Sequence, residues 1–230
     1  MQNKSSEIKV AVDAIVFGYS KQDGVSVLLI QRKYEPFKNQ WAIPGGFVLA
    51  EESLEAAVKR ELEEETGIKV SYLEQLYTFG EPDRDPRQRV ISVAYFGLVK
   101  TSQFQKLKAS TDAENAQWFG IKQLPSLAFD HRQILEVAIE RLRAKIRYQP
   151  IGFELLDKKF PFSDLEKLYI ALFGRDVNRR NFSKKILSFG VLEETGEQTR
   201  PEGKGRPSKI YQFNQKRYRE LLKAGFHFEM

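Results

Sequence analysis

Hydrophobic residues gather in four short stretches within the first hundred residues. The segments 8–17 and 25–32 are rich in Val and Ile and are separated by Asp23-Gly24, so they predict two strands joined by a turn. The segments 68–78 and 89–99 predict two more strands on either side of a polar loop. Helical periodicity begins near Ser53 and stops at Gly67, a residue suited to a left-handed helix end.

A long amphipathic helix is predicted after Asp130. Its apolar residues recur at helical spacing: Ile134, Leu135, Ala138, Leu142 and Ile146. Because strands and helices are mixed along the segment, we expect residues 1–148 to form one α/β sandwich domain.

Residues 153–230 have a different pattern. Pro and Gly near residues 149–152 mark the boundary. Two short helices (163–173 and 178–189), two short strands (191–192 and 210–213) around a polar stretch, and a last helix capped by Asn214 follow in order. This order is typical of a small winged helix-turn-helix domain.

Charge separates the two parts. The chain has a formal net charge of +6. Residues 1–150 hold 21 Lys and Arg against 20 Asp and Glu, whereas residues 151–230 hold 16 against 11, so the second part favours a polyanionic partner. The absence of cysteine excludes disulfides and Cys-ligated zinc. No segment resembles a signal peptide or a membrane span, so we expect a cytoplasmic protein with no membrane partner.

Acidic residues follow the predicted core-facing side of the helix that begins near Ser53. At 100° per residue, the stripe of Leu54, Ala57 and Val58 continues through Glu61, Glu64 and Glu65. Charges on a buried line repel and are costly to desolvate. A solvated helix face is the alternative, but a divalent cation explains the pattern better, and oxygen ligands suit Mg²⁺ or Mn²⁺.

Two glycines lie just upstream of this helix. Gly45 and Gly46 lack a Cβ, so the backbone can approach a ligand closely. A metal that polarises a diphosphate and activates a water completes the interpretation, which is a diphosphate-binding site.

The same residues resemble a known motif. Gly46, Glu52, Arg60-Glu61-Leu62, Glu64-Glu65 and Gly67-Ile68 occupy every fixed position of the Nudix box. The resemblance implies an α/β/α sandwich that hydrolyses a nucleoside diphosphate linked to another group. It also implies Glu61 and Glu65 as metal ligands beside Gly45, Glu64 as ligand or base, and Arg60 as the residue that orients the glutamates, with Gly46 at the substrate.

Residues 79–95 resemble the ADP-ribose-handling branch of that family. Arg84 and Arg87 are predicted to reach phosphate or ribose oxygens; the alternative is a solvated loop in which Arg84 pairs with Asp83 or Asp85. Three aromatic residues are candidates for stacking on adenine, and the alternative for them is the core: Tyr77, Phe79 and Tyr95.

The helix over residues 178–189 has a basic face. Phe182, Ile186 and Phe189, with Leu187 beside them, are predicted to be buried. Arg, Lys and Asn side chains suit phosphates and base edges. The predicted DNA-binding residues are Arg179, Arg180, Asn181, Lys184 and Lys185, with Lys204 and Arg206 in the wing. The alternative is a helical subdomain with a solvated basic face.

A second resemblance covers the whole chain. The segments 128–131, 150–156, 179–182, 205–207 and 211–213 resemble the Nudix-related transcriptional regulators of NrtR type. This resemblance implies homodimers on palindromic double-stranded operators, often in NAD or sugar metabolism. Many such regulators have a degraded Nudix box, whereas this chain keeps all its glutamates, so hydrolysis stays open. His131 is expected to be structural.

The leading hypothesis is a DNA-binding transcriptional regulator whose Nudix domain binds, and hydrolyses, ADP-ribose or a related nucleotide-sugar-type metabolite. One alternative is a dedicated Mg²⁺-dependent ADP-ribose pyrophosphohydrolase whose second domain serves dimerisation only. The other is a sugar-sensing regulator without turnover.

Overall fold

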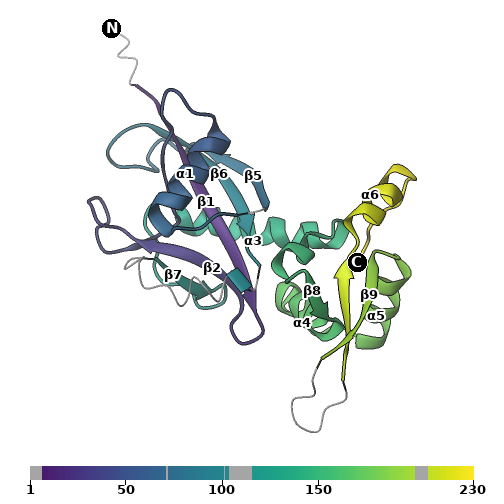
Figure 1. The fold of residues 1–230 in the computed structure, drawn as a ribbon. Coiled ribbons are helices and arrows are strands. Elements are labelled where there is room, and N and C mark those ends of the chain that lie inside the picture. Colours follow the sequence, from purple (N-terminus) through teal and green to yellow (C-terminus); the bar gives the residue numbers. More distant parts are fainter. Residues whose placement is uncertain (1–6, 71, 101, 104–115, 200–206) are drawn as a thin grey trace.

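The computed structural model describes residues 7–70, 72–100, 102–103, 116–199 and 207–230 (Figure 1). Its first part is built on a seven-stranded sheet. The strands are β1 (Lys9–Ser20), β2 (Gly24–Gln31), β3 (Trp41–Ala42), β4 (Gly45–Phe47), β5 (Tyr72–Phe79), β6 (Val90–Leu98) and β7 (Ala116–Gly120). The four predicted strands are present, while β3, β4 and β7 are additions that the pattern of hydrophobic residues did not reveal.

The sheet has the order β3-β2-β1-β6-β5, with β4 paired to β1 and β7 paired to β2. Strands β1 and β6 run parallel, and the other pairs are antiparallel. Strand β1 pairs with β2 near one end and with β4 near the other. This arrangement places Gly45 opposite Asp13 and Gly46 opposite Val12.

Helices α1 (Leu54–Thr66) and α3 (His131–Tyr148) cover opposite faces of the sheet. Successive residues of a strand point to opposite faces. Val12, Ala14 and Val16 accordingly pack beneath α1, whereas Ile15 and Phe17 pack with α3. The predicted α/β/α sandwich is confirmed.

The ends of α1 are set by local chemistry. The Ser53 side chain accepts a hydrogen bond from the backbone N–H of Ala56, which is an N-cap. Gly67 has φ 68°, and its N–H donates to the carbonyl of Glu63. Both ends lie where the sequence placed them.

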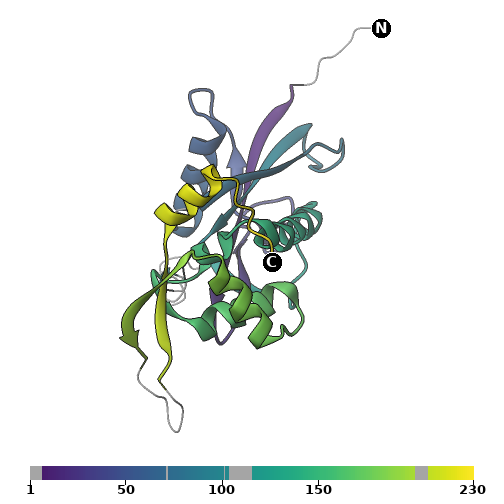
Figure 2. The ribbon, with the colours of Figure 1, turned by 90° about the vertical axis from the view of Figure 1, so that its right-hand side faces the viewer.

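The second part is a winged helix (Figure 2). Helices α4 (Phe162–Phe173) and α5 (Arg179–Ser188) precede the hairpin of β9 (Leu192–Gln198) and β10 (Lys209–Phe213), and α6 (Gln215–Lys223) follows. A short η1 helix (Ile151–Leu155) and β8 (Lys159–Pro161) come first, and the small sheet has the order β8-β10-β9. β9 is longer than predicted, because its polar residues are held by pairing with β10.

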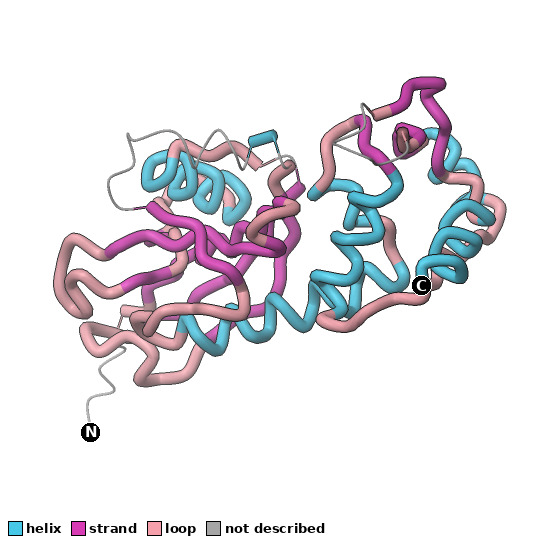
Figure 3. Tube along the Cα trace, turned by 90° about the horizontal axis from the view of Figure 1, so that it is seen from below, coloured by secondary structure: helices cyan, strands magenta, loops and turns pink. Residues whose placement is uncertain are grey.

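One hydrophobic core runs across the predicted boundary between the two parts. Buried residues of α4, such as Leu165 and Tyr169, belong to the same cluster as Phe17 and Leu142. Figure 3 shows α3 running from the sheet towards the winged helix. Arg143 Nε, on α3, donates to the backbone carbonyl of Leu172 in α4 at 3.1 Å. The two parts are therefore packed together, although their sequence patterns differ.

Polar contacts also join the two parts. Lys21, in the β1–β2 turn, forms a 2.9 Å ion pair with Asp164 of α4. The backbone N–H of Met230 donates to the carbonyl of Arg147 at 2.7 Å, which returns the C-terminal segment to α3. Among the described helices, none has the length and apolar character needed to span a membrane.

Candidate functional site

The two glycines upstream of α1 lie against other atoms so closely that no side chain fits. A Cβ on Gly45 would lie 2.2 Å from the carbonyl oxygen of Val12. A Cβ on Gly46 would lie 2.3 Å from a carboxylate oxygen of Glu61. The backbone N–H of Gly45 donates to Glu65 Oε2 at 2.9 Å. The sheet edge and the acidic helix thus meet at these glycines, as the motif implied.

Arg60 lies at the centre of the acidic residues. Its Nε and Nη2 donate to the two oxygens of Glu52 at 3.0 and 2.6 Å, a bidentate pair. Its Nη1 donates to Glu61 at 2.8 Å and to Glu64 at 3.3 Å. The hydrogen bonds with Glu52, followed by those with Glu61, raise the pKa of Arg60. This geometry fits the predicted orienting role.

Glu65, a predicted metal ligand, lies in a poorly solvated position. Burial raises its pKa to about 7, and the charges of Glu61 and Asp13 act in the same direction. The hydrogen bond from Gly45 and the charge of Arg32 oppose the rise. A bound divalent cation would favour the ionised form, so the environment of Glu65 fits a metal ligand.

The structure corrects the predicted position of the glutamates on α1. The buried stripe continues from Val58 through Leu62 and Thr66, four residues apart, and not through the glutamates. Glu61 and Glu65 are partly buried at its edge, and the Glu64 side chain is 60% exposed. The glutamates thus lie to one side of the buried stripe of α1. In this position Glu61 and Glu65 lie beside Gly45 and Gly46 and not in the core.

The donor set fits a magnesium-type ion held by few protein ligands. Among the described residues, no three Asp, Glu or His side chains are arranged so that they could hold a metal ion together. Mg²⁺ is usually bound through one or two carboxylates plus water and substrate phosphates. Glu61, which lies against Gly46, and Glu65, which accepts the N–H of Gly45, match that requirement.

Arg84 is buried and forms an ion pair with Asp130. The sequence analysis had offered a solvated loop as the alternative to a ligand contact. The Nε and Nη2 of Arg84 donate to both oxygens of Asp130 at 2.8 and 2.7 Å, and Nη2 lies 3.4 Å from Asp13 Oδ2. Ion pairing of Arg84 with Asp83 or Asp85, the alternative expected from the sequence, is wrong. A phosphate contact by Arg84 would require this buried pair to open.

The sequence analysis missed a buried polar network around Asp13. Ser92 Oγ donates to Asp13 Oδ2 at 2.5 Å, and His131 Nε2 lies 3.6 Å from Asp13 Oδ1. His131 Nδ1 accepts the backbone N–H of Ile43 at 2.9 Å, and burial lowers the pKa of His131. The structural role expected for His131 is confirmed. The sequence feature that could have indicated this network is Asp13, a single acidic residue within an otherwise apolar strand.

Two of the three aromatic candidates are core residues. Tyr95 is 2% exposed beneath α1, and Phe79 is 7% exposed in the other core cluster. The core alternative therefore holds for both. Tyr77 is 61% exposed and contacts the ring of Phe79 at a centroid distance of 5.5 Å. Tyr77 alone of the three presents its ring to solvent.

Arg87 lies near Phe47, the residue that follows the two glycines. Its Nε and Nη2 donate to both oxygens of Asp85 at 3.0 and 2.7 Å, and its side chain is 43% exposed. Its guanidinium lies 5.9 Å from the ring centroids of Phe47 and Phe129. Arg87 is thus accessible, unlike Arg84, and its predicted contact with a ligand stays a prediction.

Helix α5 exposes its basic side chains. The predicted DNA-binding residues Arg179, Arg180, Asn181, Lys184 and Lys185 are all exposed. Phe182 and Ile186 are buried as expected, whereas Leu187 is 44% exposed, so its predicted burial is wrong. Leu187 follows Ile186 by one residue and therefore lies about 100° away around the helix. Lys204 and Arg206 lie outside the described residues.

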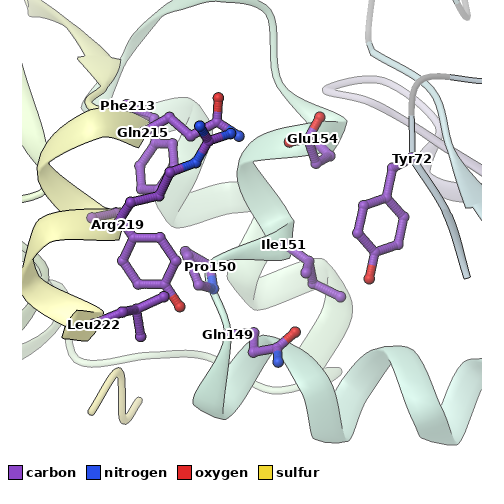
Figure 4. A pocket seen from close by; sticks show the side chains of 10 residues that line it. Tyr72, Gln149, Pro150, Ile151, Glu154, Phe213, Gln215, Arg219 and Leu222 are labelled. Atoms are coloured by element: carbon purple, nitrogen blue, oxygen red, sulfur yellow. The ribbon is translucent and has the colours of Figure 1, made fainter. Parts of the chain in front are cut away.

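A pocket of about 320 Å³ lies between the two parts of the chain (Figure 4). Tyr72 of β5 forms one side, residues 149–151 and Glu154 form its middle, and α6 contributes Tyr218 and Arg219. None of the residues predicted for the diphosphate site lines it. The pocket is therefore separate from the site at α1.

Comparison with protein families gives two matches. Residues 7–138 match the NUDIX domain, and residues 152–213 match the NrtR DNA-binding winged helix domain. The chain belongs to the NrtR family of Nudix proteins. Membership agrees with the acidic helix facing two glycines and with the winged helix that follows.

Two similar proteins carry functional names. An ADPR responsive transcriptional repressor NtrR of Acinetobacter baylyi is 36% identical over 208 residues, which cover 89% of this chain and 81% of that protein. An ADP-ribose pyrophosphatase of Methanocaldococcus jannaschii is 44% identical over 127 residues, covering 55% of this chain and 70% of that enzyme. The match to the pyrophosphatase thus covers only about half of this chain.

One solved structure of an NrtR protein is similar over nearly the whole chain, and another is similar over the Nudix part. Shewanella oneidensis NrtR complexed with a 27mer DNA has a TM-score of 0.78 at 32% identity, covering 95% of this chain and 97% of that one. The NUDIX domain of the same NrtR complexed with ADP ribose has a TM-score of 0.50 at 35% identity, covering 62% and 93%. This NrtR-family chain thus has the same order of domains.

Proposed function

We propose that the protein is an ADP-ribose-responsive, DNA-binding transcriptional repressor. The observation that carries the proposal is the joining of two complete parts in one chain. Glu61 and Glu65 face the Gly45-Gly46 backbone in the Nudix part, and α5 exposes a basic face in the winged helix. The similarity, over most of the chain, to an ADPR responsive repressor and to an NrtR–DNA complex supports both roles.

The metal, the partner copy and the location are parts of the same proposal. Glu61 and Glu65 would hold Mg²⁺ or Mn²⁺, which would bind and polarise the diphosphate. Arg60 would keep the glutamates in position, and Glu64 would act as a further ligand or as the base for water. The protein would act in the cytoplasm as a homodimer on a palindromic double-stranded operator.

Hydrolysis of ADP-ribose is a second candidate activity of the same site. The chain keeps Glu61, Glu64 and Glu65 together with Arg60, and its Nudix part is 44% identical to an ADP-ribose pyrophosphatase. The test is release of AMP from ADP-ribose with Mg²⁺ or Mn²⁺ by the wild type, Glu64→Gln and Glu65→Gln. Turnover by the wild type that each substitution abolishes supports a working hydrolytic site. If the wild type binds ADP-ribose without hydrolysing it, the glutamates serve ligand sensing.

The regulatory role is tested by fluorescence anisotropy with labelled duplexes taken from upstream of the protein's own gene. The expected result is salt-dependent binding of the operator whose affinity changes when ADP-ribose and Mg²⁺ are added, but not when AMP is added. A random duplex of equal length is the control. Equal affinity for both duplexes, or an operator affinity that ignores saturating ADP-ribose, contradicts the proposal.

A further inference from the structure

Helix α5 is joined to the preceding helix α4 by an ion pair. Arg179 Nε lies 3.2 Å from Oε2 of Glu166, a residue of α4. The Glu166 side chain is 12% exposed, whereas the Arg179 side chain is 75% exposed. A nearly buried carboxylate thus holds one side of a guanidinium that is otherwise open to solvent.

Glu166 lies on the side of α4 that packs against α5. Phe162 and Tyr169 both contact the ring of Phe182 in α5, with centroid distances of 6.0 and 5.1 Å. Phe162 is four residues before Glu166 and Tyr169 is three residues after it, and residues at these spacings are neighbours on one face of a helix. An acid at the contact between two helices is costly to bury unless it is paired. Arg179 supplies the cation that Glu166 needs.

Arg179 is the first residue of α5. Asn178 Oδ1 accepts a hydrogen bond from the backbone N–H of Asn181 at 3.0 Å, which is an N-cap that fixes the start of the helix. In helix-turn-helix proteins the N-terminal residues of the second helix contact base edges in the major groove. Arg179 therefore occupies the end of α5 that is suited to reading sequence.

The ion pair leaves most of the guanidinium available to DNA. A guanidinium has five N–H donors, of which four are on the two Nη atoms. The Glu166 carboxylate lies at Nε, and no other ion pair joins Arg179 to an acid within the described residues. Two N–H donors of one arginine match the O6 and N7 acceptors of guanine. A guanidinium that is held before DNA arrives also loses less side-chain freedom on binding.

The other basic side chains of α5 differ from Arg179 in their pairing. Within the part of the chain that the structure describes, no ion pair joins Arg180, Lys184 or Lys185 to an acid. Exposed, unpaired cations attract phosphates whatever the base sequence. The charge of Arg179 is offset by Glu166, so its contribution to that general attraction is small. The ion pair thus separates Arg179 from the cations that bind the DNA backbone.

We propose that Glu166 is a positioning residue that holds Arg179 for direct contact with a guanine of the operator. Arg180, Lys184 and Lys185 contact phosphates instead. The inference rests on the proposed DNA-binding function and adds to it a pair of residues that read sequence. Loss of the Glu166 charge would release Arg179 towards nearby phosphates, so binding would become less selective.

The test is fluorescence anisotropy of the full chain with the operator duplex and with a random duplex of equal length, over a range of salt concentrations. Glu166→Gln keeps the size of the side chain and removes its charge. Its preference for the operator over the random duplex is expected to fall about tenfold. Its slope of log affinity against log salt on the random duplex is expected to steepen by about 0.9, because Arg179 gains a phosphate contact.

Arg179→Gln should lose the same preference without a steeper slope. The double variant should be no less selective than Arg179→Gln alone, because the two residues act as one unit. Thermal unfolding checks that each variant stays folded. Arg179→Lys keeps a charge beside Glu166 but lacks the guanidinium, and it carries the test if Glu166→Gln does not fold.

Asp176→Asn is the matched control. Asp176 is exposed in the turn between α4 and α5, and among the described residues it forms no ion pair. Its substitution removes one negative charge near α5, as Glu166→Gln does, but releases no arginine. We therefore expect Asp176→Asn to keep the preference of the wild type for the operator.

A scan of the operator locates the base. Each G·C pair is replaced in turn by A·T, and the wild type should lose about tenfold in affinity at one pair of a half-site. At that pair Arg179→Gln and Glu166→Gln should lose little. The absence of such a pair, a wild-type preference in Glu166→Gln, or an equal loss in Asp176→Asn overturns the inference and leaves the proposed function standing. A wild type that does not distinguish the operator from the random duplex overturns both.

Discussion

The backbone N–H of Gly45 donates a 2.9 Å hydrogen bond to the carboxylate of Glu65, twenty residues further along the chain. The contact exists because β4 pairs with β1 while α1 packs over that face of the sheet. It brings an acid into a poorly solvated position beside a second acid, Glu61. The protonation of Glu65 therefore reports directly on the electrostatic environment of the site.

The stability of the metal-free protein should depend on the ionisation of Glu65. A carboxyl whose pKa rises from 4.5 in the unfolded chain to about 7 in the folded protein binds more protons when folded. The free energy of unfolding should therefore fall as pH rises from about 4.5 to about 7, with the loss complete above that range. The size of the loss should be on the order of 3 kcal/mol at most. Urea unfolding at several pH values, with a chelator present, measures it.

Glu65→Gln is the control for this measurement, because a glutamine cannot ionise. The difference in unfolding free energy between wild type and variant should change across the same pH range. Saturating Mg²⁺ should reduce the fall in the wild type, since the cation stabilises the ionised acid. A difference that stays constant from pH 4.5 to pH 7 would show that Glu65 titrates normally.

Gly46→Ala should damage the site more than the fold. The added Cβ would meet the Glu61 carboxylate at 2.3 Å, and the flexible end of that side chain can move away. We expect an affinity for Mn²⁺, measured by electron paramagnetic resonance, at least about tenfold weaker, with a stability loss of about 1 kcal/mol. Gly120→Ala is the control, because its Cβ would meet nothing within 4 Å. Equal Mn²⁺ affinity in both variants would contradict the close approach.

Arg84→Gln should be strongly destabilising. The Arg84 side chain is 6% exposed and pairs with Asp130 and Asp13. Its loss would remove the bidentate partner of Asp130 and the cation that faces Asp13, a buried acid that would keep only uncharged donors such as Ser92. Breaking such a pair costs about 3–5 kcal/mol. Arg132→Gln, which breaks an exposed pair with Glu136, should cost about 0.5 kcal/mol or less. Denaturant unfolding compares the two, and similar losses would refute the buried pair.

Arg180→Gln should weaken operator binding through phosphate contacts. Arg180 is exposed on α5, in the face predicted to meet DNA. Loss of one phosphate contact lowers the slope of log affinity against log salt by about 0.9. Lys59→Gln, which removes an exposed cation from α1, is the control and should leave the slope unchanged. An unchanged slope in Arg180→Gln would place its side chain away from the DNA backbone.

The sequence by itself determined the features that depend on near neighbours. Ser53 and Gly67 bound α1 because a cap needs only residues within one turn, and the Nudix spacing from Gly46 to Gly67 follows from that helix and its loop. The basic face of α5 was likewise readable from helical spacing. The order of helices and strands then identified the winged helix.

The tertiary structure decided which distant residues meet. Arg84 pairs with Asp130, 46 residues away, and no local pattern distinguishes Asp130 from the nearer Asp83 or Asp85. The ring of Phe129 meets Arg32 only because β2 and the segment before α3 lie together in the fold. Burial of Glu65 likewise depends on the packing of α1 against the sheet. These properties depend on long-range packing and desolvation, whereas hydrophobic periodicity reports only the local conformation of the chain.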